Sequence, residues 1–228
     1  FYVIFNILVF LPFFVFSELR IDITRGNTEP IPIALLKFNF KNKEEKQISS
    51  DIQSVVSNNL SRSGLFNVLP SRIFFDNSLK FESKPSFADW KLTTAQGLIH
   101  GRLNLNREKL MIEFRLWDVF SGKQMVAQEL KTEKNNWRRI AHVISDIIYN
   151  RITGESGYFD SRIVYISESG PKSNRKKRLA IIDQDGENHK FLTDGSYLAL
   201  TPRFSPAAQE IAYLSYNNQT PRIYLLDL

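Results

Sequence analysis

Apolar residues at helical spacing predict two amphipathic helices in the first two-thirds of the chain. One helix is capped by Ser49 or Ser50 and ends near Ser63; the other spans residues 136–152 and ends at Gly154, where glycine suits a left-handed stop. Their apolar faces consist of Ile52, Val55, Val56 and Leu60 in the first helix and of Ile140, Val143, Ile144, Ile147, Ile148 and Ile152 in the second. Each helix therefore needs a surface that covers one of its faces.

Alternating, β-rich segments predict the strands that supply this surface. Three of them, joined by the turn-like residues 106–108 and 121–123, are typical of an antiparallel meander. The expected elements are strands at Ile31–Phe40, Phe66–Leu69, Leu98–Asn104, Leu110–Phe120 and Gln124–Lys131, and a short helix over Phe87–Ala95. Met111 and Trp117 are apolar on the otherwise polar face of the middle strand, so we expect this strand to be covered partly on both sides. The pattern predicts an α/β (α+β) domain with a mixed sheet and two main helices over residues 30–155.

After Gly154 the helical periodicity disappears and short strands alternate with polar turns. The strands are expected at Arg162–Ile166, Leu179–Asp183, Lys190–Leu192, Glu210–Leu214 and Arg222–Leu228. RIVYIS at 162–167 is similar to EIAYLS at 210–215, and RLAIIDQDG at 178–186 is similar to RIYLLDL at 222–228. These offsets of roughly 44 to 48 residues match one four-stranded propeller blade. We therefore predict that residues 156–228 are the first one to two blades of an all-β propeller, truncated before closure.

The chain opens with the apolar run FYVIFNILVFLPFFVF. This run is shorter than the roughly 20 residues of a membrane-spanning helix, and the residues at 15 and 17 suit signal-peptidase cleavage. We interpret residues 1–17 as a secretory signal whose charged leader is missing. A buried strand or a membrane anchor is the alternative.

A short strand is expected directly after this signal. Apolar and polar side chains alternate in ELRIDIT, and the residues up to 29 form a linker. The candidate interaction site consists of Glu18, Leu19, Arg20, Ile21, Asp22, Ile23 and Thr24. Such a strand can pair with its own domain or add to the sheet edge of a partner protein.

The sequence contains no constellation typical of catalysis or metal binding. It has no cysteine, which excludes disulfides, thiolate metal sites and cysteine nucleophiles. His100, His142 and His189 are far apart and have no carboxylate at ligand spacing, so we expect His142 to be a packing residue. Tyr158 stands where a nucleophile elbow would need its second glycine. We therefore expect no catalytic residue, no metal, no cofactor and no small-molecule substrate.

The net charge of +6 arises from 30 Lys and Arg against 24 Asp and Glu, which is too weak to select one class of anionic partner. The densest positive segment is KSNRKKR at residues 172–178, between two expected strands. No aromatic residue is interleaved there, which favours a solvated hairpin tip over a nucleic-acid contact. We expect no nucleic-acid partner, and contact with peptidoglycan or with lipid phosphates is the alternative for this segment.

Several stretches together resemble the TolB family of periplasmic Tol-Pal proteins. They are GRL at 101–103 leading into FRLWD at 114–118, AHVISDIIYNRITG at 141–154, GYF at 157–159 before RIVYI, and PRFSP at 202–206 before EIAYLS. They cover nearly the whole chain, although Ala207 and Ala208 stand where the family's propeller repeats usually carry Asp-Gly. The resemblance implies a non-enzymatic scaffold of the periplasm that maintains outer-membrane integrity and constriction during cell division.

The resemblance also implies two protein partners. The peptidoglycan-associated lipoprotein Pal binds the propeller, mostly through later blades, and would attach the protein peripherally to the outer membrane. The N-terminal segment, which corresponds here to Glu18–Thr24, contacts TolA or occupies an interface of its own domains.

Two other functions fit parts of the sequence. A propeller-bearing hydrolase or peptidase would share the repeats, and its catalytic domain would lie beyond residue 228 and carry a G-x-S-x-G elbow. A solute-binding envelope protein would need a deep polar pocket in the first domain.

Overall fold

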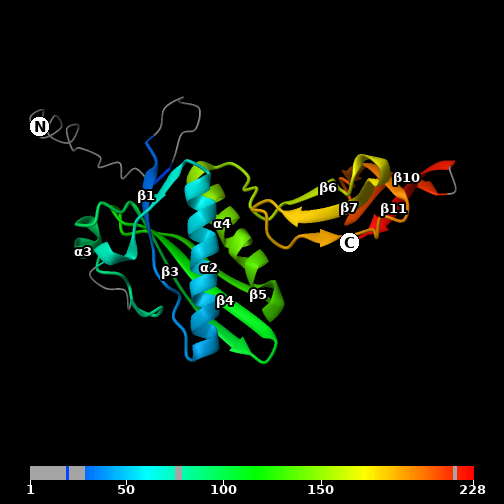
Figure 1. Cartoon of the computed structure of the whole chain (residues 1–228). Helices are drawn as coiled ribbons and strands as arrows, with labels where there is room; N and C mark the ends of the chain where they lie inside the picture. The colour runs from blue at the N-terminus through cyan, green and yellow to red at the C-terminus, as the bar shows by residue number, and fades with distance from the viewer. Residues whose placement is uncertain (1–18, 21–28, 75–78, 218–219) are drawn as a thin grey trace, which may run out of the picture. The chain divides into compact units, whose positions relative to one another are not determined.

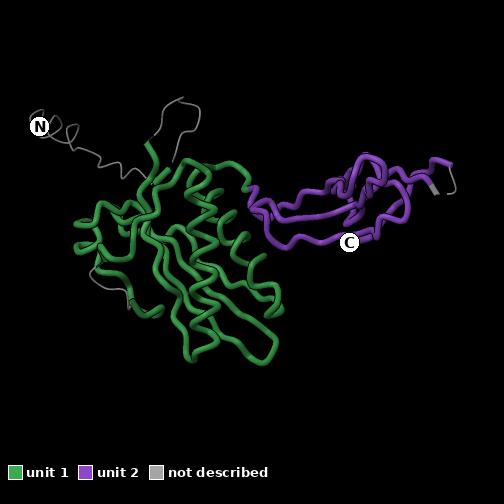
Figure 2. Tube along the Cα trace, in the orientation of Figure 1, with its two compact units in different colours: residues 1–157 green, residues 158–228 purple. Residues whose placement is uncertain are grey.

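The computed structural model describes residues 19–20, 29–74, 79–217 and 220–228, whose elements are labelled in Figure 1. The chain divides into two compact units, residues 1–157 and residues 158–228 (Figure 2). The expected signal at residues 1–17 lies outside the described residues. Among the described residues, no helix combines the length and the apolar character needed to cross a membrane.

The first unit is built on a five-stranded mixed sheet with the strand order β2-β1-β3-β4-β5. β1 (Ile31–Leu35) pairs in parallel with both β2 (Phe66–Val68) and β3 (Gly97–Asn106). β4 (Lys109–Asp118) and β5 (Gln124–Glu133) continue the sheet as the antiparallel meander expected from the sequence. The prediction of a mixed α/β domain is therefore confirmed.

Two long helices lie over one face of this sheet, α2 (Lys43–Arg62) and α4 (Trp137–Thr153), the latter preceded by the 3-10 turn η3 (Lys134–Asn136) (Figure 1). Their apolar faces and the inward side chains of the strands form one buried core, in which burial of apolar area supplies most of the stabilisation. Fully buried members of this core include Ile52, Val56, Ile99, Ile112, Phe114, Ile144 and Ile148. Gly154 ends α4 in the left-handed conformation, with φ of 81°, as its position predicted.

The helix expected to begin at Ser49 or Ser50 begins earlier, at Lys43, so that prediction of the start was wrong. Asn42 is the capping residue, and its side-chain oxygen accepts a hydrogen bond from the backbone N–H of Glu45 at 2.9 Å. Ser49 lies inside the helix and donates to the carbonyl of Phe38. The first turn is mostly charged, so the periodicity of apolar residues does not reveal it.

Glu45 is the reason that this charged turn is helical and packed. Its carboxylate is buried and accepts hydrogen bonds from the backbone N–H groups of Lys41 at 2.6 Å and Leu105 at 2.9 Å. The strand expected at Ile31–Phe40 is also shorter in the structure, where β1 ends at Leu35. Beyond it, the chain contacts β3 through an isolated bridge at Asn39.

The other face of the sheet is covered in part by the segment between β2 and β3. This segment contains η2 (Ser71–Ile73) and the short helix α3 (Phe87–Lys91), which ends before the expected Ala95. Trp90 of α3 and Trp117 of β4 are buried in a second apolar cluster there. Met111 is only half-buried, so β4 is covered on both sides at one end, as expected.

The second unit consists of two three-stranded antiparallel sheets among the described residues, with the orders β6-β7-β8 and β11-β10-β9. Their elements are β6 (Arg162–Ser169), η4 (Lys172–Asn174), β7 (Lys176–Asp183), β8 (Lys190–Phe191), β9 (Leu198–Phe204), β10 (Glu210–Asn217) and β11 (Thr220–Asp227). The two repeats found in the sequence form the hairpins β6–β7 and β10–β11. Strand β9 was not expected, because Pro202 interrupts its pattern.

The two sheets of the second unit share one small core. Leu179 and Ile181 of β7, Ala199 of β9 and Ile211 of β10 are its buried members. Each repeat thus buries its apolar residues against the next one, as stacked propeller modules do. The fold is therefore a mixed α/β domain followed by propeller-type β-sheets.

Candidate protein-interaction site

Leu19, in the N-terminal segment, is attached to the first unit. Its backbone N–H donates a hydrogen bond to Oδ2 of Asp118 at 3.1 Å. Its half-buried side chain packs against the main core, beside Ile33 and the backbone of Gly97. The start of the described chain is thus held by its own domain through one polar and one apolar contact.

Asp118 is positioned by the connection between β4 and β5. It is the last residue of β4, and its Oδ1 accepts from the backbone N–H groups of Phe120 at 2.9 Å and Ser121 at 3.2 Å. The residue is 2% exposed. One carboxylate therefore closes the turn with one oxygen and holds Leu19 with the other.

Arg20 lies at the C-terminal end of α4. A Cβ atom placed on Gly154 would lie 3.2 Å from a guanidinium nitrogen of Arg20, so the two residues are neighbours. The C-terminal end of a helix carries a partial negative charge, which favours a cation there by about 0.3–1 kcal/mol. Arg20 is exposed, so this contribution is at the low end.

The structure thus brings Leu19 and Arg20 of the candidate site together with Asp118 and Gly154. The other members of the site lie outside the described residues and stay a prediction; they are Glu18, Ile21, Asp22, Ile23 and Thr24. Sequence reasoning did not single out Asp118. An aspartate at the end of a strand and four residues before a glycine indicates a turn, but nothing local indicates the contact with Leu19.

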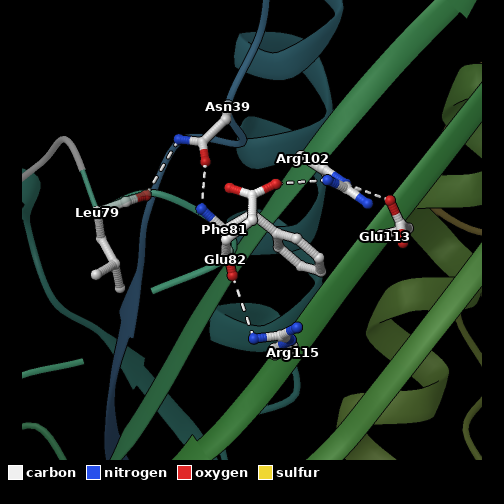
Figure 3. A network of polar contacts seen from close by, with 7 residues as sticks. All are labelled: Asn39, Leu79, Phe81, Glu82, Arg102, Glu113 and Arg115. Carbon is white, nitrogen blue, oxygen red and sulfur yellow. Dashed lines mark hydrogen bonds and ion pairs between the residues drawn. The ribbon is translucent and has the colours of Figure 1, made fainter. Parts of the chain in front are cut away.

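A second polar cluster lies on the face of the sheet opposite to α2 and α4. It involves two arginines (Figure 3). The guanidinium groups of Arg102 and Arg115 lie 4.7 and 4.4 Å from the ring centre of Phe81. Arg102 also forms ion pairs with Glu82 and Glu113, and Arg115 donates to the carbonyl of Phe81 at 3.2 Å. The carboxylates, mainly through the hydrogen bond with Glu113, raise the pKa of Arg102.

Asn39, which follows β1 in the chain, also binds the segment that contains Phe81 and Glu82. Its side chain donates to the carbonyl of Leu79 at 3.2 Å and accepts from the backbone N–H of Phe81 at 2.8 Å (Figure 3). The two arginines are therefore occupied in holding residues 79–82 on the sheet. This arrangement is typical of a packing contact rather than of an anion-binding pair.

Two histidines of the first unit, His100 and His142, are buried. His100 accepts a hydrogen bond on Nε2 from the indole N–H of Trp117 at 2.9 Å. Burial, assisted by the nearby Arg115, lowers the pKa of His100 from 6.5 to about 4, so the ring is neutral at pH 7. His142 is buried in α4 beside Asn59 of α2, with 2.9 Å between its Nδ1 atom and the amide nitrogen of Asn59, and the packing role expected for it stays a prediction.

The chain matches two domain families. It matches the TolB amino-terminal domain over residues 19–125 and the TolB beta propeller domain over residues 149–228. It is 50% identical over 213 residues to the Tol-Pal system protein TolB of Paramagnetospirillum magneticum, and this alignment covers 93% of this chain and 48% of the relative. It is 47% identical over 234 residues to the Tol-Pal system protein TolB of Pelagibacter ubique, and this alignment covers 99% of this chain and 52% of the relative. The chain therefore spans about half the length of these curated relatives.

A solved structure shows the same fold. The crystal structure of TolB from Acinetobacter baumannii matches with a TM-score of 0.71 and 26% sequence identity. The match covers 92% of this chain and 50% of that chain.

Proposed function

Because this chain belongs to the TolB family, we propose that it is a non-enzymatic scaffold of the Tol-Pal system in the periplasm. It binds TolA through residues 18–24 and Pal through its propeller, and it supports outer-membrane integrity and constriction during cell division. The observation that carries the TolA part is the way in which Leu19 and Arg20 are attached to the first unit.

At the two described residues, Leu19 and Arg20, this attachment is weak enough to be exchanged. There it rests on one backbone hydrogen bond, one half-buried leucine side chain and one exposed cation at a helix end. A net hydrogen bond contributes about 0.5–1.5 kcal/mol, half burial of a leucine side chain about 1 kcal/mol and the cation less than about 1 kcal/mol. A partner that offers a full sheet edge can supply more than this through several main-chain hydrogen bonds.

Docking and strand addition also compete for the same group. The N–H of Leu19 points at Asp118 when the segment is docked, and a sheet edge would use backbone N–H groups of the same segment. The docked state and the TolA-bound state therefore exclude one another at this residue. Occupancy of the propeller by a partner can then be signalled to TolA through the release or retention of the segment.

The test is the binding of TolA and Pal to the full-length protein. Deletion of residues 18–24 is expected to abolish TolA binding, measured by calorimetry, and to leave the affinity for Pal unchanged. A sharper version replaces Ile21 and Ile23 by Asp, with Asp22→Asn and Thr24→Ser as the matched control at the alternate positions of the strand expected from the sequence. TolA binding that survives the deletion would exclude the role of this segment.

The scaffold role itself is tested in cells. A strain without the protein is expected to leak a periplasmic reporter and to divide with delayed outer-membrane constriction, and the full-length protein should reverse both defects. The deletion variant should restore neither if TolA binding is required. The hydrolase considered from the sequence is supported by neither of the two curated relatives, which are about twice as long and carry the TolB name.

A further inference from the structure

The β6–β7 hairpin of the second unit ends in an ordered and strongly basic tip. Ser169 and Lys176 form the last residue pair of the hairpin, and the 3-10 turn η4 lies in the loop that connects its two strands. Gly170 has φ of 89°, and a Cβ on it would lie 2.7 Å from the backbone oxygen of Asn174, so the tip depends on this glycine. Its basic residues are Lys172, Arg175, Lys176, Lys177 and Arg178.

Part of this charge is used within the hairpin. Glu168 pairs with Lys177 at 2.7 Å and with Arg175 at 3.2 Å. These cations, first of all through the hydrogen bond from Lys177, lower the pKa of Glu168. The guanidinium group of Arg178 lies 3.6 Å from the ring centre of Phe191 on β8, so Arg178 is a packing residue.

Lys172 and Lys176 are the two exposed lysines that remain. Within the described ranges, no salt bridge joins either of them to a carboxylate. Asp194 is the other carboxylate near the tip, and its pKa is lowered mainly by hydrogen bonds from Ser196, with a smaller contribution from Lys176. Five cations therefore face two carboxylates, Glu168 and Asp194, and the tip keeps an excess of positive charge.

The shape of the tip decides which anionic partner suits it. Residues 168–176 are all exposed on a hairpin end, which can approach a flat charged surface but does not enclose the side chains of a peptide. Residues 172–178 contain no aromatic side chain on which a nucleobase could stack. We propose that the β6–β7 tip is a docking surface for the anionic phospholipid headgroups of a membrane, with Lys172 and Lys176 as the main contacts.

The expected strength follows from the charge excess. Each lysine close to an anionic bilayer contributes about 1 kcal/mol, which corresponds to about fivefold in affinity. An excess of about three charges gives a preference of about 100-fold for anionic over zwitterionic bilayers at low salt. Screening over about 10 Å at 0.1 M salt makes the attachment reversible, so the tip orients the protein at a surface rather than anchoring it.

The experiment is co-sedimentation of the full chain with two kinds of vesicle, phosphatidylcholine alone and phosphatidylcholine with 30% (mol/mol) phosphatidylglycerol, a composition of about one anionic lipid in three. The measured quantity is the ratio of the two affinities, so that any apolar contribution from elsewhere in the chain cancels. The double variant Lys172→Gln/Lys176→Gln is expected to lower this ratio by about tenfold or more. Raising the salt from about 0.05 M to about 0.3 M should lower the wild-type ratio toward one.

The matched control is Lys91→Gln/Lys123→Gln, which removes the same charge from exposed positions of the first unit. It should leave the ratio within about twofold of the wild type. Circular dichroism of each variant verifies that the strands persist. Equal binding to both vesicles, or an equal loss in the control and the tip variant, would overturn the proposal. Because the assay contains neither Pal nor TolA, its outcome is independent of the proposed scaffold function.

Discussion

The backbone N–H of Leu19 donates to Oδ2 of Asp118 at 3.1 Å, and these residues lie 99 positions apart in the sequence. The other oxygen of the same carboxylate closes the turn after β4. A residue that the local turn requires therefore also holds the N-terminal segment. This double use allows the docked segment to be perturbed without changing the segment itself.

Asp118→Asn is expected to release Leu19 while keeping the turn. The amide oxygen can still accept from Phe120 and Ser121, but the amide nitrogen then faces the N–H of Leu19 and cannot accept from it. Loss of this hydrogen bond should weaken the attachment of the segment by about 1 kcal/mol and so raise the rate of tryptic cleavage after Arg20 about fivefold. Cleavage after Arg175, in the second unit, serves as the internal reference. An unchanged ratio of the two rates would show that this hydrogen bond does not hold the segment.

Gly154→Ala tests the contact between Arg20 and the end of α4. Gly154 has φ of 81°, so alanine costs about 1 kcal/mol in strain, and its Cβ would crowd the guanidinium group of Arg20. The matched control is Gly64→Ala at the end of α2, where φ is 75° and nothing lies within 4 Å of the added atom. Both variants should lower the urea midpoint similarly, and only Gly154→Ala should speed tryptic cleavage after Arg20. Equal cleavage rates in the two variants would contradict the contact.

Glu45→Ala is expected to destabilise the first unit by about 2–4 kcal/mol, because two backbone N–H groups lose a buried charged acceptor. Glu44→Ala is the matched control. Glu44 forms a surface ion pair with Lys134, and its loss should cost less than about 1 kcal/mol. Urea unfolding followed by tryptophan fluorescence measures both. Similar losses in the two variants would mean that Glu45 has no special role in joining α2 to β3.

His100→Phe is expected to reduce the acid sensitivity of the first unit. The pKa of folded His100 is about 4 and its ordinary value is 6.5, so the unfolded chain takes up the proton first as the pH falls. The stability that the neutral ring provides is fully present above pH 6.5 and is lost as the pH falls toward 4. The shift corresponds to at most about 3 kcal/mol, caused mainly by burial and secondly by Arg115.

The measurement for His100 is the free energy of unfolding in urea at several pH values between 4 and 7. The variant loses the hydrogen bond from Trp117, which lowers its stability by about 1 kcal/mol at every pH. Its stability should nevertheless fall less steeply below pH 6.5 than that of the wild type. Parallel curves for the two proteins would show that His100 does not titrate differently in the folded state.

Much of the architecture follows from local patterns in the sequence. The apolar stripes of α2 and α4, the meander β3–β4–β5 and the repeats in the second unit were all predicted and are all present. The candidate strand at Glu18–Thr24 stays a prediction, because the structure describes only Leu19 and Arg20 of it, and these contact the first unit. These features are readable because side-chain periodicity reports which face of an element must be buried.

Other features depended on partners that are distant in the sequence. The charged first turn of α2 is helical because Asn42 caps it and Glu45 bonds to β3, and strand β9 forms in spite of Pro202 because β10 pairs with it. No local rule could weigh such contacts against the propensities of the residues concerned.

By itself, the sequence determined the two-part organisation of this protein, the positions of its main helices and strands, and the family to which it belongs. Only the tertiary structure decided that Asp118 and Gly154 receive Leu19 and Arg20, and that Arg102 and Arg115 are engaged with Phe81. The reason is physical: periodicity and turn chemistry act over a few residues, whereas a hydrogen bond or a ring contact depends on where the folded chain places groups that the sequence keeps far apart.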